Sequence, residues 1–303
     1  MNSVEVNSIT KAYKTADALK GVSFSIGKGE LFGFIGPDGA GKTSLFRILT
    51  TLLLPDSGTA NVEGLDVVKD YKKIRRIIGY MPGKFSLYQD LTVEENLNFF
   101  ATIFGTTIAE NYELVKDIYR QIEPFKKRRA GQLSGGMKQK LALSCALIHK
   151  PAVLFLDEPT TGVDAVSRKE FWEMLRKLKE GGITILVSTP YMDEASLCDR
   201  VALIQNGSIM TISTPGEVIT AYPHQLFAVR SETFYQLIAD LRGYPEMHSV
   251  QPFGQSVHFS GGKRKLAKEE IINYLQKSGH RNIYVEEITP TIEDCFMELM
   301  SRG

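Results

Sequence analysis

The stretch Gly36-Pro37-Asp38-Gly39-Ala40-Gly41-Lys42-Thr43-Ser44 decides the fold of this chain, because it spells the Walker A phosphate loop. Glycines let backbone N–H groups turn toward phosphate oxygens, and a helix that starts here presents its positive N-terminal end to the same anion. Lys42 is expected to reach the β- and γ-phosphates, Thr43 to bind Mg²⁺, and Ser44 to contact the α-phosphate. An apolar run at residues 31–35 and a helical pattern at 45–49 supply the strand and the helix that the motif requires.

A second motif places two carboxylates at the end of another apolar strand. Residues 153–156 run into Asp157-Glu158-Pro159-Thr160, the ending called Walker B. Asp157 can hold Mg²⁺ through water, and Glu158 can orient and deprotonate an attacking water as a general base. Adjacent acidic residues also occur in surface turns, but the phosphate loop upstream favours the catalytic interpretation. Lys42 and Glu158 are therefore the predicted catalytic residues.

The composition is that of an ordinary globular protein and argues against several classes of function. With 43% apolar and 23% charged residues, the 303-residue chain is long enough for two domains. The formal net charge of +1 gives no reason to expect nucleic acid as a partner. Three widely spaced cysteines form neither a metal motif nor a disulfide framework, which fits a reducing cytoplasm. We expect neither a signal peptide nor a membrane helix, so a membrane role requires a separate partner chain.

Alternating strand and helix patterns predict an α/β domain followed by a smaller α+β domain. Strands are expected near residues 3–9, 21–26, 31–35, 59–67, 77–81, 152–156, 183–187 and 201–210, with helices at about 92–129 and 167–180. Thr92 and Glu95 are spaced as a capping box for the first of these helical regions. Residues 225–287 follow the ferredoxin-like order β-α-β-β-α-β, with a last helix at 292–300; a loose regulatory tail is the alternative. The predicted domains are residues 1–222, with a helical subdomain at about 84–150, and residues 223–303.

The stretch Leu133-Ser134-Gly135-Gly136 identifies the family that the chain resembles. A serine and two glycines at the start of a helix make a second anion site, which a phosphate bound at Lys42 does not need. The ordered motifs from Val4 to Thr214 resemble the nucleotide-binding subunit of ATP-binding-cassette (ABC) transporters, whose signature is Leu-Ser-Gly-Gly. The resemblance implies a P-loop NTPase cassette with a parallel core sheet, an antiparallel β subdomain and a helical signature subdomain. It also implies ATP and Mg²⁺ as cofactors, and a signature that binds the nucleotide held by a second ATPase subunit.

Further site residues follow only from this resemblance. Tyr13 matches the aromatic residue that stacks on adenine, although a buried core tyrosine would give the same sequence. Asp164 matches the loop through which the two subunits of the family communicate. A membrane partner is expected to dock between residues 81 and 100. The apolar side chains there, which fit an ordinary core equally well, are Phe85, Leu87, Tyr88 and Leu91.

Two positions depart from the family pattern. Where the family usually has a glutamine that touches Mg²⁺ and water, this chain has Gly83. Where the family usually has a histidine that contacts the γ-phosphate, this chain has Pro190, which has no side-chain donor and no N–H. Losing such a donor typically costs about 10²–10³ in rate. We therefore expect slow hydrolysis at this site and a heterodimer with a faster second site; the alternative is a homodimer in which Lys84 or Tyr191 substitutes.

The end of the chain narrows the expected function to export. Residues 290–296, Pro-Thr-Ile-Glu-Asp-Cys-Phe, are similar to the ending of drug- and antibiotic-efflux ATPases that work with separate permeases of type-2 exporters. We therefore expect an ATPase subunit, peripheral on the cytoplasmic face of the inner membrane, that energises integral-membrane permease chains. The alternative is a regulatory cassette with negligible hydrolysis that completes a partner's site. A cassette acting on DNA or ribosomes is disfavoured by the single cassette and the near-neutral charge.

Overall fold

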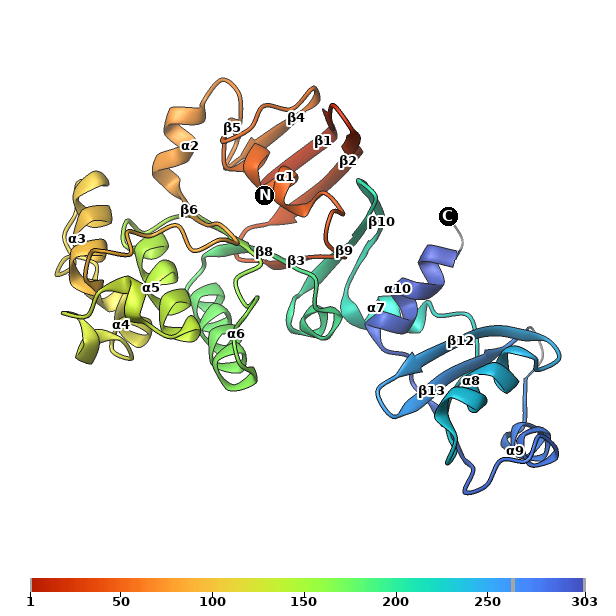
Figure 1. Ribbon diagram of the computed structural model, residues 1–303. Helices are drawn as coiled ribbons and strands as arrows, with labels where there is room; N and C mark the ends of the chain where they lie inside the picture. The colour runs from red at the N-terminus through yellow and green to blue at the C-terminus, as the bar shows by residue number, and fades with distance from the viewer. Residues whose placement is uncertain (1, 263–264, 302–303) are drawn as a thin grey trace. The chain divides into compact units, whose positions relative to one another are not determined.

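The computed structural model describes residues 2–262 and 265–301, which form two compact units (Figure 1). The first unit comprises Met1–Pro215 and the second Gly216–Gly303. The domain boundary proposed from the sequence, after residue 222, lies beyond a short helix, α7 (Pro215–Thr220), that the sequence patterns did not suggest. None of the helices in the described part of the chain has both the length and the apolar character of a membrane span.

A six-stranded sheet forms the centre of the first unit and carries the phosphate loop. Its strands are β3 (Leu31–Ile35), β6 (Ile78–Met81), β7 (Val153–Asp157), β8 (Thr184–Thr189), β9 (Arg200–Gln205) and β10 (Ser208–Ser213). The order is β10-β9-β3-β8-β7-β6, with β10 antiparallel to β9 and parallel pairing from β9 to β6. Strands β3 and β7 are buried at every residue, as expected for the middle of a parallel sheet. The predicted parallel core is confirmed.

An antiparallel sheet packs on this core through a cluster of phenylalanines. Its strands, in the order β2-β1-β4-β5, are β1 (Asn2–Tyr13), β2 (Ala16–Gly27), β4 (Ser57–Val62) and β5 (Leu65–Asp66). Helix α1 (Lys42–Leu49) joins the same apolar core. The ring contacts, with centroids 5.0 to 6.2 Å apart, link Phe24, Phe32, Phe34, Phe46 and Phe155. Phe46 lies on α1, so this packing fixes the helix that follows the phosphate loop.

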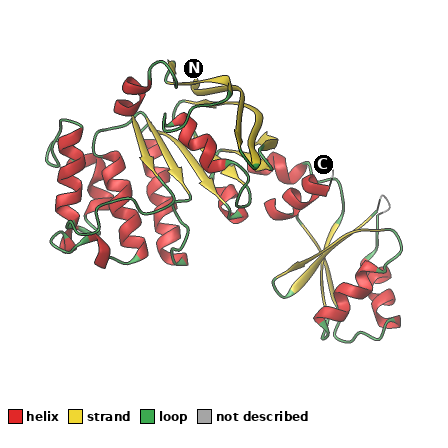
Figure 2. Cartoon of the chain, turned by 45° about the horizontal axis from the view of Figure 1, so that its top comes forward, coloured by secondary structure: helices red, strands yellow, loops and turns green. Residues whose placement is uncertain are grey.

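Helices gather beside the central sheet in the first unit, as Figure 2 shows in red. They are α2 (Tyr71–Ile77), α3 (Val93–Ile103), α4 (Tyr112–Tyr119), α5 (Gly135–Leu147) and α6 (Ala165–Glu180), with 3-10 turns at Glu123–Phe125, Ala130–Gln132 and Met192–Leu197. The predicted capping box at α3 is confirmed: Thr92 Oγ1 accepts the Glu95 N–H at 3.2 Å, and Glu95 Oε2 accepts the Thr92 N–H at 2.8 Å. Helix α2 was not predicted, because Ile74 is its one buried residue and gives no apolar period.

The second unit has the ferredoxin-like arrangement that the sequence predicted. Its elements are β11 (Leu226–Arg230), α8 (Phe234–Arg242), β12 (Met247–Phe253), β13 (Ser256–Gly261), α9 (Lys268–Lys277), β14 (Tyr284–Ile288) and α10 (Ile292–Ser301). The antiparallel sheet has the order β12-β13-β11-β14. Helices α8 and α9 contribute apolar residues to one core with the sheet. This unit therefore has a core of its own, and the alternative of a loose tail is wrong.

Two carboxylates one turn apart attach α10 to neighbouring strands. Asp294 Oδ1 lies 2.7 Å from His258 Nδ1, and Glu298 Oε2 lies 2.7 Å from His248 Nε2. Asp294 Oδ2 also accepts the N–H of Thr291 at 2.8 Å, which caps the helix. Burial alone would raise the pKa of Asp294, but hydrogen bonds from His258 and Thr291 more than offset it and hold this pKa below the usual value. Residues 290–296, which resemble the ending of efflux ATPases, therefore include the pair that caps this helix.

Candidate nucleotide-binding site

The phosphate loop joins the end of β3 to the start of α1, and a close backbone neighbour requires glycine at its last position before the helix. Gly41, the residue before α1, has φ +104°, a left-handed conformation that favours glycine. A Cβ atom at Gly41 would lie 2.2 Å from the carbonyl oxygen of Ala18, so no side chain fits there. The N–H of Gly36 donates to the carbonyl oxygen of Thr189 at 3.3 Å. This bond ties the loop to the end of β8.

Lys42 is a buried cation at the centre of the loop. Its side chain is 2% exposed, and Nζ donates to the carbonyl oxygens of Gly36 at 2.8 Å and Pro37 at 3.0 Å. The same ammonium lies 3.4 Å from Glu158 Oε1, just beyond the end of β7. The two residues predicted to be catalytic therefore meet in the folded chain, although they are far apart in the sequence.

Thr43 and Asp157 offer the oxygen atoms predicted to hold Mg²⁺. Thr43 Oγ1 donates to Asp157 Oδ1 at 3.2 Å, and Asp157 is buried. A hydroxyl that can bind Mg²⁺ directly therefore lies beside a carboxylate that can hold the ion through one of its waters, as suits an octahedral Mg²⁺ site that keeps several waters. The residues present therefore fit a magnesium ion. Burial, together with the charge of Asp157, raises the pKa of Tyr80 on β6 to about 12, so this phenol stays neutral beside the site.

Ser188, for which the sequence predicted no role, fixes both Walker B residues. Its hydroxyl donates to Asp157 Oδ1 at 2.6 Å, and its Oγ accepts the backbone N–H of Glu158 at 3.0 Å. The Ser188 carbonyl accepts the same N–H, also at 3.0 Å. These bonds hold Glu158 in a left-handed backbone conformation, φ +50°, which costs an L-residue about 1–2 kcal/mol. A polar residue at the end of an apolar strand was the signal that could have revealed Ser188.

Tyr13 ends β1 close to the helix that follows the loop. The residue is 46% exposed, so it is not the buried core tyrosine that the sequence allowed. Its hydroxyl lies 3.2 Å from Oγ of Ser44, in the first turn of α1. An exposed aromatic ring that is hydrogen-bonded to a residue of the phosphate loop is suitable for stacking on a base.

The signature residues form a separate group at the start of α5. Ser134 caps this helix, because its Oγ accepts the N–H of Met137 at 3.4 Å. Ser134 and Gly135 are exposed, whereas Gly136 is buried. A Cβ atom at Gly136 would lie 2.7 Å from Oγ of Ser167 on α6, so this glycine allows α5 and α6 to approach. The helix start, with its exposed serine, is accessible to an anion.

Asp164 caps α6, a structural role that the sequence did not predict. Its Oδ1 accepts the N–H groups of Val166 at 3.1 Å and Ser167 at 3.0 Å. Hydrogen bonding from Ser167, and more weakly from Val166, holds the pKa of this exposed carboxyl below its usual value. The loop before α6 also approaches the signature, since a Cβ atom at Gly135 would lie 3.2 Å from the Gly162 carbonyl oxygen.

The two positions that depart from the family pattern adjoin this site. A Cβ atom at Gly83 would lie 3.0 Å from the carbonyl oxygen of Asp157, so a side chain there requires the neighbouring backbone to move by a few tenths of an ångström. Pro190 directly follows β8. Lys84 and Tyr191 are the two residues that could substitute at these positions. The guanidinium carbon of Arg168 lies 4.6 Å from the ring centroid of Tyr191, whereas Lys84 is exposed.

Comparison with known proteins gives consistent matches. The sequence model of the family described as "ABC transporter" matches residues 19–161, a range that holds the phosphate loop, the signature and Walker B. The chain is 38% identical to the probable multidrug ABC transporter ATP-binding protein YbhF of Escherichia coli K12, over 98% of this chain and 52% of that protein. It therefore spans about half the length of YbhF. It is 33% identical to the Nod factor export ATP-binding protein I of Rhizobium sp. N33, over 99% of this chain and 97% of that protein.

A solved structure with a similar fold contains bound nucleotide. It is the dimeric ATP-binding cassette MJ0796 in a post-hydrolysis state, bound to ADP and Pi. The TM-score is 0.64 at 27% sequence identity, covering 70% of this chain and 98% of that chain. The predicted cassette architecture is therefore confirmed.

Proposed function

The chain belongs to the ABC transporter family of ATP-binding proteins, and we propose that it binds and hydrolyses ATP as the ATP-binding subunit of an exporter. This proposal rests on the cluster of Lys42, Thr43, Asp157 and Glu158 at the ends of β3 and β7. A phosphate-binding lysine, a pair of oxygen ligands for Mg²⁺ and a carboxylate base are the parts that ATP hydrolysis needs. The names of YbhF and the Nod factor protein, a multidrug transporter component and an export protein, favour export.

In the proposed reaction, Glu158 takes a proton from water while the water oxygen forms a bond to the γ-phosphorus. The bond from the γ-phosphorus to its bridging oxygen breaks, and ADP and inorganic phosphate are the products. Lys42 exchanges its contacts with loop carbonyls for phosphate oxygens and stabilises the negative charge of the transition state. When Mg²⁺ is bound, it would be held by Thr43 and Asp157 and would neutralise charge on the β- and γ-phosphates. Tyr13 stacks on the adenine.

The signature residues are assigned to a nucleotide held by a second ATP-binding subunit. Ser134 and Gly135 are exposed at a helix start, where backbone N–H groups and the helix dipole favour an anion. The loop that ends at Asp164 lies beside them and carries the contact between the two subunits. In this proposal ATP therefore joins two subunits, each of which binds one side of the nucleotide.

We infer that the ATP site of this chain binds nucleotide well and hydrolyses it slowly. Pro190 cannot donate a hydrogen bond to the γ-phosphate, and Gly83 cannot contact water or metal through a side chain. Of the two residues that could substitute, Tyr191 is packed against Arg168 and Lys84 is exposed. A different cassette protein that supplies its own histidine would complete a faster second site, so a heterodimer is favoured over a homodimer.

The test compares ATP hydrolysis by the purified chain with that of Pro190→His, using Pro190→Ala as a matched control. We expect Pro190→His to release phosphate about 10²-fold faster than the natural chain, the size of effect seen for preorganised donors. Pro190→Ala restores only a backbone N–H and is expected to stay near the natural rate. If the natural chain already matches Pro190→His, the slow-site proposal is wrong.

A second candidate function is a regulatory cassette that uses ATP as a dimer-forming ligand with negligible hydrolysis. The absence of a side chain at Gly83 and of a donor at Pro190 favours it, and the retained Glu158 argues against it. Phosphate release by this chain alone, and then after mixing with a second cassette protein, separates the two functions. If Glu158→Gln in this chain leaves phosphate release by the mixture unchanged, hydrolysis takes place only at the second protein's site, which supports the regulatory function.

The proposed membrane contact is an apolar cavity of about 310 Å³ between the sheet and the helices of the first unit. It is lined by Leu87, Phe100 and Phe104, among others. Tyr88, the next residue after Leu87 in the sequence, is 51% exposed. We assign this cavity to a cytoplasmic segment of a permease chain, which would hold the subunit at the cytoplasmic face of the inner membrane.

The ATP-binding cassette is assigned to residues 1–222 and an accessory domain to residues 223–303.

A further inference from the structure

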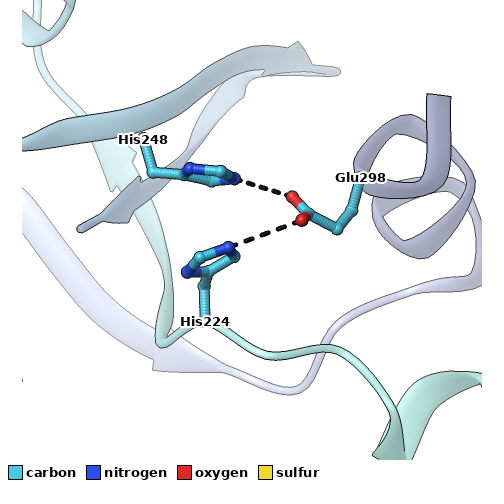
Figure 3. A group of neighbouring side chains, drawn as sticks. All are labelled: His224, His248 and Glu298. Carbon is cyan, nitrogen blue, oxygen red and sulfur yellow. Dashed lines mark hydrogen bonds and ion pairs between the residues drawn. The ribbon is translucent and has the colours of Figure 1, made fainter. Parts of the chain in front are cut away.

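Two histidines and a buried glutamate converge in the second unit, outside every element of the proposed ATP site (Figure 3). Glu298 comes from α10, His248 from β12, and His224 from the segment before β11. Each histidine directs Nε2 at a different oxygen of the same carboxylate, at 2.7 Å for His248 and 3.5 Å for His224. The three ligand atoms all lie within 4.8 Å of one another.

We propose that His224, His248 and Glu298 form a binding site for a divalent transition-metal ion of the Zn²⁺ class. Two imidazole nitrogens and one carboxylate oxygen are a ligand set that Zn²⁺ prefers and that Mg²⁺ and Ca²⁺ do not. In a tetrahedral Zn²⁺ site with bonds of about 2.0–2.1 Å, neighbouring ligand atoms lie about 3.3 Å apart. Small rotations of the three side chains bring the observed atoms to that spacing.

The surroundings of the cluster suit a cation that can enter and leave. The Glu298 side chain is 7% exposed, so its charge is largely removed from water, and a bound cation would stabilise this charge in addition to the two histidines. His248 is 31% exposed and lines a cavity of about 350 Å³ together with Glu298, which gives the ion a path from solvent. A second buried carboxylate, Asp294, also lines this cavity, as does one cation, Arg242. Three protein ligands leave a fourth position for water or another ligand.

The bound ion would join three segments that are distant in the sequence. The rings of His224 and His248 already lie with centroids 3.8 Å apart, so the two ligands are held together before a metal arrives. Coordination by Glu298 would connect both to the C-terminal helix α10. The ion therefore stabilises the attachment of α10 within the second unit, and this inference does not rest on the proposed ATPase activity.

The experiment titrates ZnCl₂ into the untagged 303-residue chain after chelator treatment, and binding is followed by calorimetry and metal analysis. We expect one saturable Zn²⁺ per chain, an unfolding midpoint that rises with Zn²⁺, and no comparable effect of Mg²⁺. Binding should weaken as the solution is acidified, because protons compete with the metal for its ligands. Co²⁺ in place of Zn²⁺ should give visible absorption bands typical of a site with nitrogen and oxygen ligands.

The variants His224→Gln, His248→Gln and Glu298→Gln should each lower Zn²⁺ affinity by about tenfold or more. His149→Gln is the matched control, since this histidine lies in the first unit and should leave the affinity unchanged. Glu298→Gln could disturb the fold, so His248→Gln, at a partly exposed side chain, is the deciding variant. Zn²⁺ binding equal to that of the natural chain in His248→Gln and His224→Gln, or no saturable binding at all, overturns the proposal.

Discussion

The ammonium of Lys42 lies 3.4 Å from a carboxylate oxygen of Glu158, so the phosphate-binding cation and the proposed base are in direct contact. Glu158→Gln keeps the shape of the side chain and removes both its charge and its basicity. We expect ATP hydrolysis to fall by about 10²–10⁴. ATP affinity should be kept or increase, because one negative charge beside the triphosphate is removed. Phosphate release and nucleotide binding, measured on the same preparation, check this.

Glu173→Gln is the matched control for that prediction. Glu173 is an exposed residue on α6, and its replacement should leave both hydrolysis and ATP binding at the natural level. Hydrolysis by Glu158→Gln at the natural rate would show that Glu158 is not the base.

Ser188→Ala tests whether this buried serine positions Glu158. The variant removes the 2.6 Å hydrogen bond to Asp157 and one of the two acceptors of the Glu158 N–H. We expect the free energy of unfolding to fall by about 1–2 kcal/mol. Because Ser188 acts through Glu158, kcat should fall while KM for ATP changes little. Ser196→Ala, at an exposed serine in the following 3-10 turn, is the control, and an unchanged kcat in Ser188→Ala would contradict the positioning role.

Gly136→Ala tests the close approach of the signature helix to α6. The new Cβ would lie 2.7 Å from Oγ and 2.9 Å from Cβ of Ser167. We expect a loss of about 1–3 kcal/mol in the free energy of unfolding, as is usual for overpacking. Ser167→Gly removes both clashing atoms, so the double variant should lose less stability than the sum of the two single variants. Strictly additive values in this double-mutant cycle would exclude a direct clash.

The low pKa of Asp294 predicts a pH dependence of the second unit's stability. A carboxyl whose pKa is lower in the folded chain than its ordinary value of 3.8 stabilises the fold above that value. This stabilisation is lost as the pH falls from about 4 through the lowered pKa. Asp294→Asn should therefore reduce the free energy of unfolding by about 1.5–3 kcal/mol at pH 7, and by less at pH 3.

Denaturant unfolding at the two pH values measures this difference. Asp117→Asn is the control, because Asp117 forms an exposed ion pair with Lys177 that contributes little. An effect of Asp294→Asn that is equally large at pH 3 would contradict the assignment of the stabilisation to the charged carboxylate.

Much of the fold was predictable because its signals are local. The phosphate loop identified β3 and α1, the Thr92 and Glu95 pair identified the start of α3, and the alternation of patterns identified the ferredoxin-like unit. The candidate site residues Lys42 and Glu158 could be identified for the same reason, since each belongs to a short motif, and the fold brings their two side chains together. Boundaries differed by a few residues where strands continue beyond their apolar part, as in β1, which extends to Tyr13.

The contacts that were not predictable join distant segments. Ser188 acquires its role only when β8 pairs with β7, which sets its hydroxyl against Asp157. His224, His248 and Glu298 share no spacing in the sequence, and only the folded second unit brings them together. The helix-capping role of Asp164 was not predicted for a different reason. The motif that identified this residue concerns the contact between subunits and does not indicate that its carboxylate also caps α6.

The two carboxylates of α10 determine how this helix can attach to the sheet. Asp294 reaches β13 and Glu298 reaches β12, and these strands are direct neighbours. A slide of the helix by one residue would turn both carboxylates by about 100° around its axis, away from both histidines at once. Both contacts would then break together, so a partly shifted helix keeps neither of them. The C-terminal helix therefore has a single register on the sheet, and it docks or detaches as a unit.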